Sequence, residues 1–84
     1  EEFLILLKDV DIEGALILAE KNRLAIEHTF LDVSGEKLHV TISTGISCFI
    51  QCDNADSLVA RADQALYKSK NNGRNCVSSI EGIS

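Results

Sequence analysis

The sequence predicts an α/β fold, an α+β sandwich in which two helices pack on a sheet, in the order strand, helix, strand or hairpin, helix, strand. An apolar run at residues 3–7 and an alternating segment at residues 38–43 indicate strands. Two further segments space their apolar residues as amphipathic helices do. The chain has 84 residues, 45% apolar and 25% charged, so it fits one small globular domain over residues 1–84.

The first strand and the first helix are predicted from residues 3–28. The continuous apolar run from Phe3 to Leu7 is typical of an interior strand covered on both faces. Asp9 or Asp11 can then cap a helix that runs from about residue 12 to residue 28. Its apolar positions keep helical spacing, so one face of this helix is expected to pack on the sheet: Ile12, Ala15, Leu16, Ala19, Ile26 and Phe30.

A turn and a second strand are predicted in the middle of the chain. Residues 31–37, with Ser34-Gly35 near their centre, indicate a turn or short hairpin. Residues 38–43 alternate apolar and polar side chains and are rich in β-branched residues, which makes them the clearest strand in the sequence. Gly45 interrupts this alternation before it resumes at residues 46–50, which indicates a bulge or a close backbone approach there.

The second helix is predicted to begin after a capping residue and to end at a glycine. Either Asp53 with Asp56 or Asn54 with Ser57 can supply the N-cap. Gly73 can take the left-handed conformation that closes a helix. Residues 75–80 then predict a last short strand, and residues 81–84 a frayed tail.

The second helix carries an excess of positive charge. Four basic residues and one acid lie between residues 61 and 74, whereas the whole chain has a net charge of −5. A basic helix end on an acidic chain can bind an anion. The same residues also fit ordinary helix-ending chemistry, because cations favour the carboxyl end of a helix. The basic residues are Arg61, Lys68, Lys70 and Arg74.

The remaining composition indicates a cytoplasmic domain. Cys48, Cys52 and Cys76 are odd in number and lack the clustering of a zinc site, so we interpret them as free thiols. No apolar run approaches the ~20 residues that cross a bilayer, so no membrane contact is expected. The sequence begins Glu-Glu-Phe without a starting methionine or a leader, and we therefore expect further sequence upstream.

Three motifs together resemble the C-terminal part of the GGDEF family, the bacterial diguanylate cyclases. They are Glu-Glu-Phe at residues 1–3, Thr-Ile-Ser-Thr-Gly at residues 41–45, and Arg-Ala-Asp-Gln-Ala-Leu-Tyr-Lys-Ser-Lys-Asn-Asn-Gly-Arg-Asn at residues 61–75. The family motif is Gly-Gly-(Asp or Glu)-Glu-Phe, and this chain starts at its third residue. The resemblance implies the latter half of a nucleotidyl-cyclase-like domain, ferredoxin-like with βαββαβ order, that lacks its first strands.

The same resemblance implies an enzyme that condenses two GTP molecules into cyclic di-GMP between two facing domains. It therefore implies a homodimer that uses Mg²⁺ or Mn²⁺. No binding to a nucleic acid polymer is expected. Glu1 looks like the motif acid that binds the metal and helps to activate the ribose 3′-hydroxyl. Glu2 looks like the second motif acid, which supports the metal site. Lys70 and Arg74 match positions that contact the phosphates of the nucleotide, and both side chains suit phosphate oxygens.

Other family positions are matched less closely. Asp63 is expected to be structural and to fix a neighbouring basic group, and Tyr67 is also interpreted as structural. Lys21 and Arg23 lie where the family often carries basic residues that help to bind product dimers. Asn22 stands where the helix pattern expects an apolar residue, so it would need a hydrogen-bond partner if buried.

Several family features do not occur in these 84 residues: the motif glycines, the first strand with its metal-binding aspartate, the phosphate-binding turn, the guanine-recognising residues and the Arg-x-x-Asp product site. The 84 residues alone are therefore expected to be inactive. The alternative is a degenerate GGDEF signalling module that binds nucleotide or a protein partner without catalysis. The strands at Phe3 and Thr41 flank the missing strand in the family, so we expect them to pair with each other or with a second copy.

Overall fold

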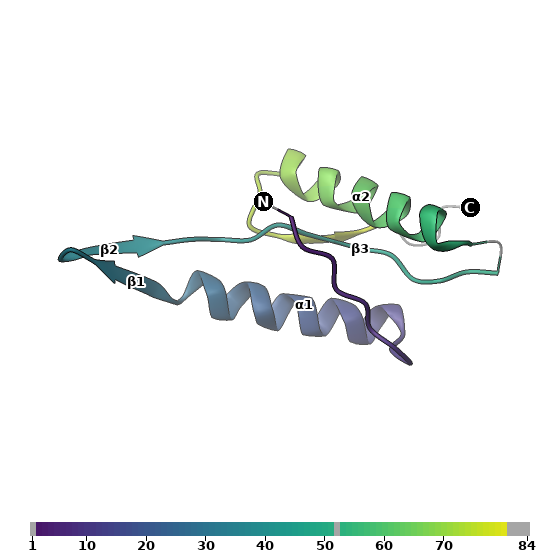
Figure 1. Ribbon diagram of the computed structural model, residues 1–84, viewed down its shortest axis with the longest axis horizontal. Helices are drawn as coiled ribbons and strands as arrows, with labels where there is room; N and C mark the ends of the chain where they lie inside the picture. The colour runs from purple at the N-terminus through teal and green to yellow at the C-terminus, as the bar shows by residue number, and fades with distance from the viewer. Residues whose placement is uncertain (1, 52, 81–84) are drawn as a thin grey trace.

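Two helices enclose a short parallel pair of strands in the computed structural model, which describes residues 2–51 and 53–80. The elements are α1 (Ile12–Glu27), β1 (Phe30–Val33), β2 (Glu36–His39), β3 (Thr44–Ile46), α2 (Ala55–Asn71) and β4 (Val77–Ser79). The helix α2 lies on one side of β3 and β4, and α1 lies on the other (Figure 1). The predicted α/β layering is therefore confirmed.

The β3–α2–β4 unit contains the most buried residues of the described chain. β3 and β4 are parallel, with Thr44 opposite Val77 and Ile46 opposite Ser79. Ala65 and Ser69 of α2 are fully buried against this pair. The hydroxyl of Ser69 donates to the carbonyl oxygen of Thr44 at 2.8 Å, because a carbonyl can only accept. This hydrogen bond thus fixes the last turn of α2 to β3.

Gly45 is the point at which β3 and α2 approach most closely. A Cβ atom built on Gly45 would lie 2.0 Å from the backbone nitrogen of Leu66 and 2.4 Å from the carbonyl oxygen of Ala62. Only a residue without a side chain fits this contact. The predicted close backbone approach at Gly45 is confirmed, and Gly45 pairs in register with Ser78 rather than forming a bulge.

The hairpin β1–β2 projects from the end of α1, away from the helices and the parallel pair (Figure 1). Its strands are antiparallel and joined by Ser34 and Gly35, both of which have positive φ angles, 52° and 84°. Two such residues form the kind of tight turn that matches the twist of a hairpin. The predicted hairpin is confirmed, and every residue of its strands is exposed.

Local capping signals place both helices where they were predicted. Asp11, one of the two proposed caps for α1, accepts a hydrogen bond from the backbone nitrogen of Gly14 at 2.7 Å. For α2, Asn54 and Ser57 form a reciprocal capping box. Beyond α2, Gly73 has a φ of 101°, the left-handed conformation expected there.

Two strand predictions are wrong. Residues 2–7 are extended but pair with no other strand among the described residues, and Phe3 and Leu6 are 84% and 83% exposed. The predicted strand at residues 38–43 is divided instead, because residues 38 and 39 pair within the hairpin, whereas β3 begins only at Thr44. An apolar run indicates residues that favour burial, but it does not show which helices or strands would cover them.

Several smaller predictions are also decided. The expected pairing of Phe3 with Thr41 is not formed within the described part of the chain. Asn22 is exposed and needs no buried partner. The last strand is confirmed with the narrower bounds of β4, while Glu1, Cys52 and the predicted tail at residues 81–84 lie outside the described residues.

Candidate functional site

Lys70 and Glu2, two of the predicted site residues, meet in the structure although 68 positions separate them. The Nζ atom of Lys70 donates to Oε2 of Glu2 at 3.1 Å. The side chain of Glu2 is 61% exposed and that of Lys70 is 34% exposed. An exposed ion pair of this kind contributes only about 0–1 kcal/mol, so a ligand can separate the two groups at little cost.

A shallow hollow of about 140 Å³ lies beside this ion pair. Its lining comes from the N-terminal segment and from one face of α2: Glu2, Asp63, Leu66, Tyr67 and Lys70. The four α2 residues are spaced at i, i+3, i+4 and i+7, which places them on the same side of a helix. The hollow therefore presents two carboxylates and one ammonium group around a small apolar floor.

Asp63 does not have the role predicted for it. It lines the hollow and makes no ion pair with a described residue, whereas the basic neighbour Arg61 pairs with Asp53. Arg61 also donates to the carbonyl oxygen of Cys48 at 2.8 Å, which joins α2 to the segment after β3. A hydrogen bond from the backbone nitrogen of Ile50, followed by those from Ser57 and Arg61, holds the pKa of Asp53 below its ordinary value.

Arg74 lies just beyond the end of α2 with its side chain exposed and without a hydrogen bond to any described residue. Its backbone is held firmly, since its nitrogen donates to the carbonyl oxygen of Ser69 at 3.0 Å. Arg74 and Asn75 have positive φ angles of 64° and 49°. This conformation costs residues with side chains about 1–2 kcal/mol each, so the surrounding contacts must stabilise it.

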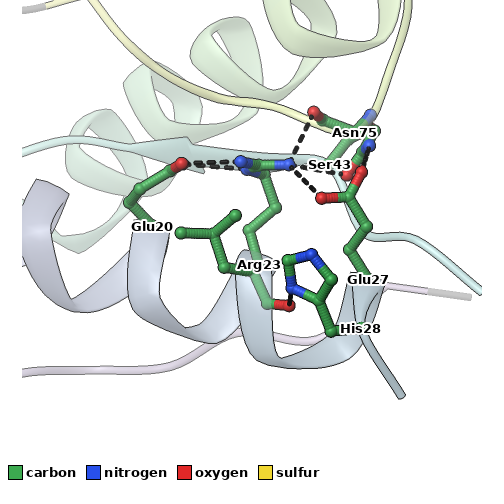
Figure 2. Close-up of polar contacts among 7 residues, drawn as sticks. Glu20, Arg23, Glu27, His28, Ser43 and Asn75 are labelled. Atoms are coloured by element: carbon green, nitrogen blue, oxygen red, sulfur yellow. Dashed lines mark hydrogen bonds and ion pairs between the residues drawn. The ribbon is translucent and has the colours of Figure 1, made fainter.

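A polar network that was not predicted from the sequence contacts this segment through Asn75 (Figure 2). Arg23 donates to both carboxylate oxygens of Glu20 at 2.8 and 2.6 Å, and to Oδ1 of Asn75 at 3.0 Å. Asn75 donates in turn from Nδ2 to Glu27 at 2.6 Å. Glu20 and Glu27 stand three positions before and four positions after Arg23, a helical charge pattern that the sequence does contain.

The charges in this network stabilise one another. The hydrogen bonds with Glu20 raise the pKa of Arg23 further above its ordinary value, and the hydrogen bond from Arg23 lowers the pKa of Glu20. The side chain of Arg23 is only 14% exposed, whereas Lys21 is exposed. The guanidinium group of Arg23 is therefore hydrogen-bonded within the chain and mostly buried, which disagrees with a direct role in binding product.

The donor set suits a magnesium ion better than a zinc ion. Mg²⁺ usually takes one or two carboxylates from a protein and fills its other positions with water and phosphate oxygens. Glu2 and Asp63 offer carboxylates at the hollow. Within residues 2–51 and 53–80, no three His, Cys, Asp or Glu side chains form a ready cluster for a metal. Glu1, the other predicted ligand, lies outside the described residues.

Two further predictions concern the cysteines and the membrane. Cys48 and Cys76 are free thiols, as predicted, and the Sγ atom of Cys76 donates to the carbonyl oxygen of Ser69 at 3.4 Å. Neither helix in the described ranges has the length and apolar character required to span a bilayer.

The fold and the site together define a mixed α/β domain with a charged hollow at the carboxyl end of one helix. The family model described as "Diguanylate cyclase, GGDEF domain" matches residues 1–76. The chain therefore belongs to the GGDEF family. This finding confirms the resemblance carried by the three motifs.

Curated relatives agree with this assignment. Diguanylate cyclase A of Treponema denticola is 42% identical over 79 residues, which cover 93% of this chain and 21% of that protein. The response regulator PleD of Caulobacter vibrioides is 36% identical over 80 residues, covering 92% of this chain and 18% of PleD. The chain thus spans about a fifth of the length of these relatives.

A solved structure has the same fold. The GGDEF domain of DgcB from Caulobacter crescentus, crystallised in complex with c-di-GMP, superimposes with a TM-score of 0.82 at 28% sequence identity. The match covers 87% of this chain and 43% of the DgcB chain. The chain thus has the fold of part of a GGDEF domain.

Proposed function

We propose that this chain supplies part of the catalytic domain of a diguanylate cyclase, which condenses two GTP molecules into cyclic di-GMP. The observation that carries the proposal is the contact of Lys70 with Glu2 at 3.1 Å, because the resemblance assigns phosphate binding to Lys70 and support of the metal site to Glu2. The family match over residues 1–76 and the relatives that are named diguanylate cyclases support the same activity.

Lys70 and Arg74 bind the phosphates of GTP in this proposal. Both are basic and both stand at the carboxyl end of α2. A triphosphate offers Lys70 several anionic oxygens, and hydrogen bonds between charged partners are roughly twice as strong as neutral ones. The nucleotide therefore displaces Glu2 from Lys70, and Arg74 adds its planar fork on neighbouring phosphate oxygens.

The displaced Glu2, together with Glu1, holds Mg²⁺ or Mn²⁺ in this proposal. A bound divalent ion would neutralise charge on the phosphates and stabilise the leaving group. Glu1 accepts the proton of the ribose 3′-hydroxyl of one GTP. That 3′-oxygen forms a bond to the α-phosphorus of the second GTP, the bond from this phosphorus to its β-bridging oxygen breaks, and pyrophosphate leaves. In the second step, the 3′-oxygen of the second nucleotide loses its proton and bonds to the α-phosphorus of the first. The bond from that phosphorus to its β-bridging oxygen breaks, so the ring closes and a second pyrophosphate leaves.

The reaction needs two nucleotides facing each other, so we propose a homodimer in which each domain presents one GTP. The location proposed for it is the cytoplasm, where GTP is available. The chain covers 43% of the DgcB chain that it resembles. We therefore propose that the isolated 84-residue polypeptide does not turn over GTP and that activity belongs to the longer protein that contains it.

The test is formation of cyclic di-GMP from GTP and Mg²⁺ by the full-length protein. Lys70→Ala and Arg74→Ala should each raise KM for GTP about tenfold or more, because each removes a charge-assisted hydrogen bond. Glu2→Gln should lower kcat and weaken the dependence on Mg²⁺. Lys8→Ala, which removes an exposed cation outside the site, is the control. Turnover by the 84 residues alone would contradict the proposed inactivity.

The alternative function is a degenerate module that binds nucleotide or a protein partner without catalysis. In this alternative, Glu2 stays paired with Lys70 and holds no metal ion. The same full-length protein distinguishes the two functions. Binding of GTP without any cyclic di-GMP in the presence of Mg²⁺ or Mn²⁺ would support the module and contradict the enzyme.

A further inference from the structure

The segment that carries Arg74 is held in an unfavourable backbone conformation. Arg74 and Asn75 are consecutive residues with side chains, and both have positive φ angles, 64° and 49°. Such a conformation persists only where the surroundings determine it. Gly73, which precedes them, accounts for the left-handed turn at the end of the helix. It does not account for the positive φ angles of Arg74 and Asn75.

Asn75 makes the hydrogen bonds that connect this segment to the rest of the structure. Its backbone nitrogen donates to Oγ of Ser43 at 3.1 Å, and its side-chain nitrogen donates to Glu27 at 2.6 Å. Its side-chain oxygen accepts from Arg23 at 3.0 Å. The backbone nitrogen, the side-chain nitrogen and the side-chain oxygen of Asn75 thus each have a partner, and these partners come from α1 and from the segment that leads into β3 (Figure 2).

The guanidinium group of Arg23 is oriented by Glu20 as well as by Asn75. Two hydrogen bonds to Glu20, at 2.8 and 2.6 Å, orient the guanidinium group as a fork on a carboxylate. The remaining Nη1 atom then points to Asn75, and the side chain is 14% exposed. Arg23 has little exposed surface for contact with a substrate, and its hydrogen bond to Asn75 connects it to the residue that follows Arg74.

We propose that Arg23 and Asn75 are positioning residues for Arg74: they lock the left-handed backbone after α2 and so aim the exposed guanidinium group of Arg74 at the phosphates of the nucleotide. This inference rests on the proposed function, because it takes Arg74 as a phosphate ligand. It assigns to α1 a role in nucleotide affinity that involves no contact between α1 and the nucleotide. A lysine at position 23 could not hold Glu20 and Asn75 with the same fork.

The test is a double-mutant cycle on the full-length protein. The measured quantity is the dissociation constant of a GTP analogue with a methylene group between its α- and β-phosphates, determined by calorimetry without turnover. Arg74→Ala should weaken binding about tenfold. Arg23→Ala and Asn75→Gly should weaken it about three- to tenfold, and neither should weaken it further in the Arg74→Ala background. Lys8→Ala is the charge-matched control and should leave the dissociation constant unchanged.

Asn75→Gly guards against a folding artefact, because glycine accepts a positive φ without strain and removes only the side-chain contacts. Thermal unfolding by circular dichroism checks that each variant is folded. Two results overturn the proposal while leaving the proposed function intact: unchanged affinity in Arg23→Ala and Asn75→Gly, or effects that multiply with that of Arg74→Ala. A wild-type protein that does not bind the analogue, or an Arg74→Ala variant that binds it normally, contradicts both the proposed function and this inference.

Discussion

Replacing Gly45 by alanine should destabilise the protein more than the same change at Gly14, Gly35 or Gly73. The new Cβ would lie 2.0 Å from the backbone nitrogen of Leu66, 2.4 Å from the carbonyl oxygen of Ala62 and 2.5 Å from the Cα atom of Leu66. All three atoms belong to the backbone of α2. No side chain can rotate away to make room, so the helix itself must move.

The size of the effect follows from that movement. Restoring an ordinary contact of 3.4 Å requires a displacement of about 1.4 Å between β3 and α2. Two hydrogen bonds span this interface, from Ser69 to the carbonyl oxygen of Thr44 at 2.8 Å and from Ser47 to that of Leu58 at 2.7 Å. Losing both costs about 2 kcal/mol, and overpacking adds about 1–3 kcal/mol. We expect a total of about 3–5 kcal/mol.

Equilibrium unfolding in urea, followed by circular dichroism, measures this loss. Gly35→Ala is the control, because Gly35 has a φ of 84° but no atom within 4 Å of its added Cβ. Gly35→Ala should cost about 1–2 kcal/mol from its left-handed backbone alone, so it measures a glycine substitution that causes no steric clash. The reasoning would be refuted if Gly45→Ala lowered the free energy of unfolding by no more than Gly35→Ala does.

Two further predictions concern the entry to α2. Asn54→Ala removes the capping box and should lower the free energy of unfolding by about 1 kcal/mol, whereas Asn54→Asp should retain most of it; urea titrations of both variants check this. The pKa of Asp53 is lowered in the folded chain, so its stabilising contribution is complete above the ordinary value of about 4 and is lost as the pH falls through the lower folded value. Asp53→Asn should therefore reduce the urea midpoint at pH 7, and this reduction should become smaller as the pH falls below the ordinary pKa of an aspartate. A reduction that does not change with pH would contradict this assignment.

The parts of the fold that were predicted correctly depend on residues close together in the sequence. The caps at Asp11 and Asn54 and the turn at Ser34-Gly35 are each decided within about four residues. The wrong predictions depend on distant partners. The apolar run after Glu2 predicts a strand that is covered on both faces. Whether such a strand is covered depends on helices and strands elsewhere in the fold, which the run itself does not reveal.

The candidate site shows the same division. Glu2 and Lys70 were named from the family resemblance, and the structure brings their side chains together. Arg74 was named on the same basis, and it lies at the expected helix end with an exposed side chain. The link between Arg23 and Asn75 spans 52 positions, so neither residue's helical or turn pattern could indicate the other. The spacing of charges along the helix can indicate only the local contacts of that network, those of Arg23 with Glu20 and Glu27.

The continuity of the β3–α2–β4 unit has a kinetic consequence. Residues 44–79 bring β3 beside β4 by closing a single connection. By contrast, α1 has no buried residue and is linked to Asn75 by the hydrogen bonds of Arg23 and Glu27. In native-state hydrogen exchange, amides of β3 and the middle of α2 should be protected longest, and those of α1 should exchange earlier. When α1 detaches, Arg23 leaves Asn75, so the segment after α2 gains freedom while the interior of the parallel unit is still folded. Sub-global opening would thus begin at α1 and reach Arg74 first.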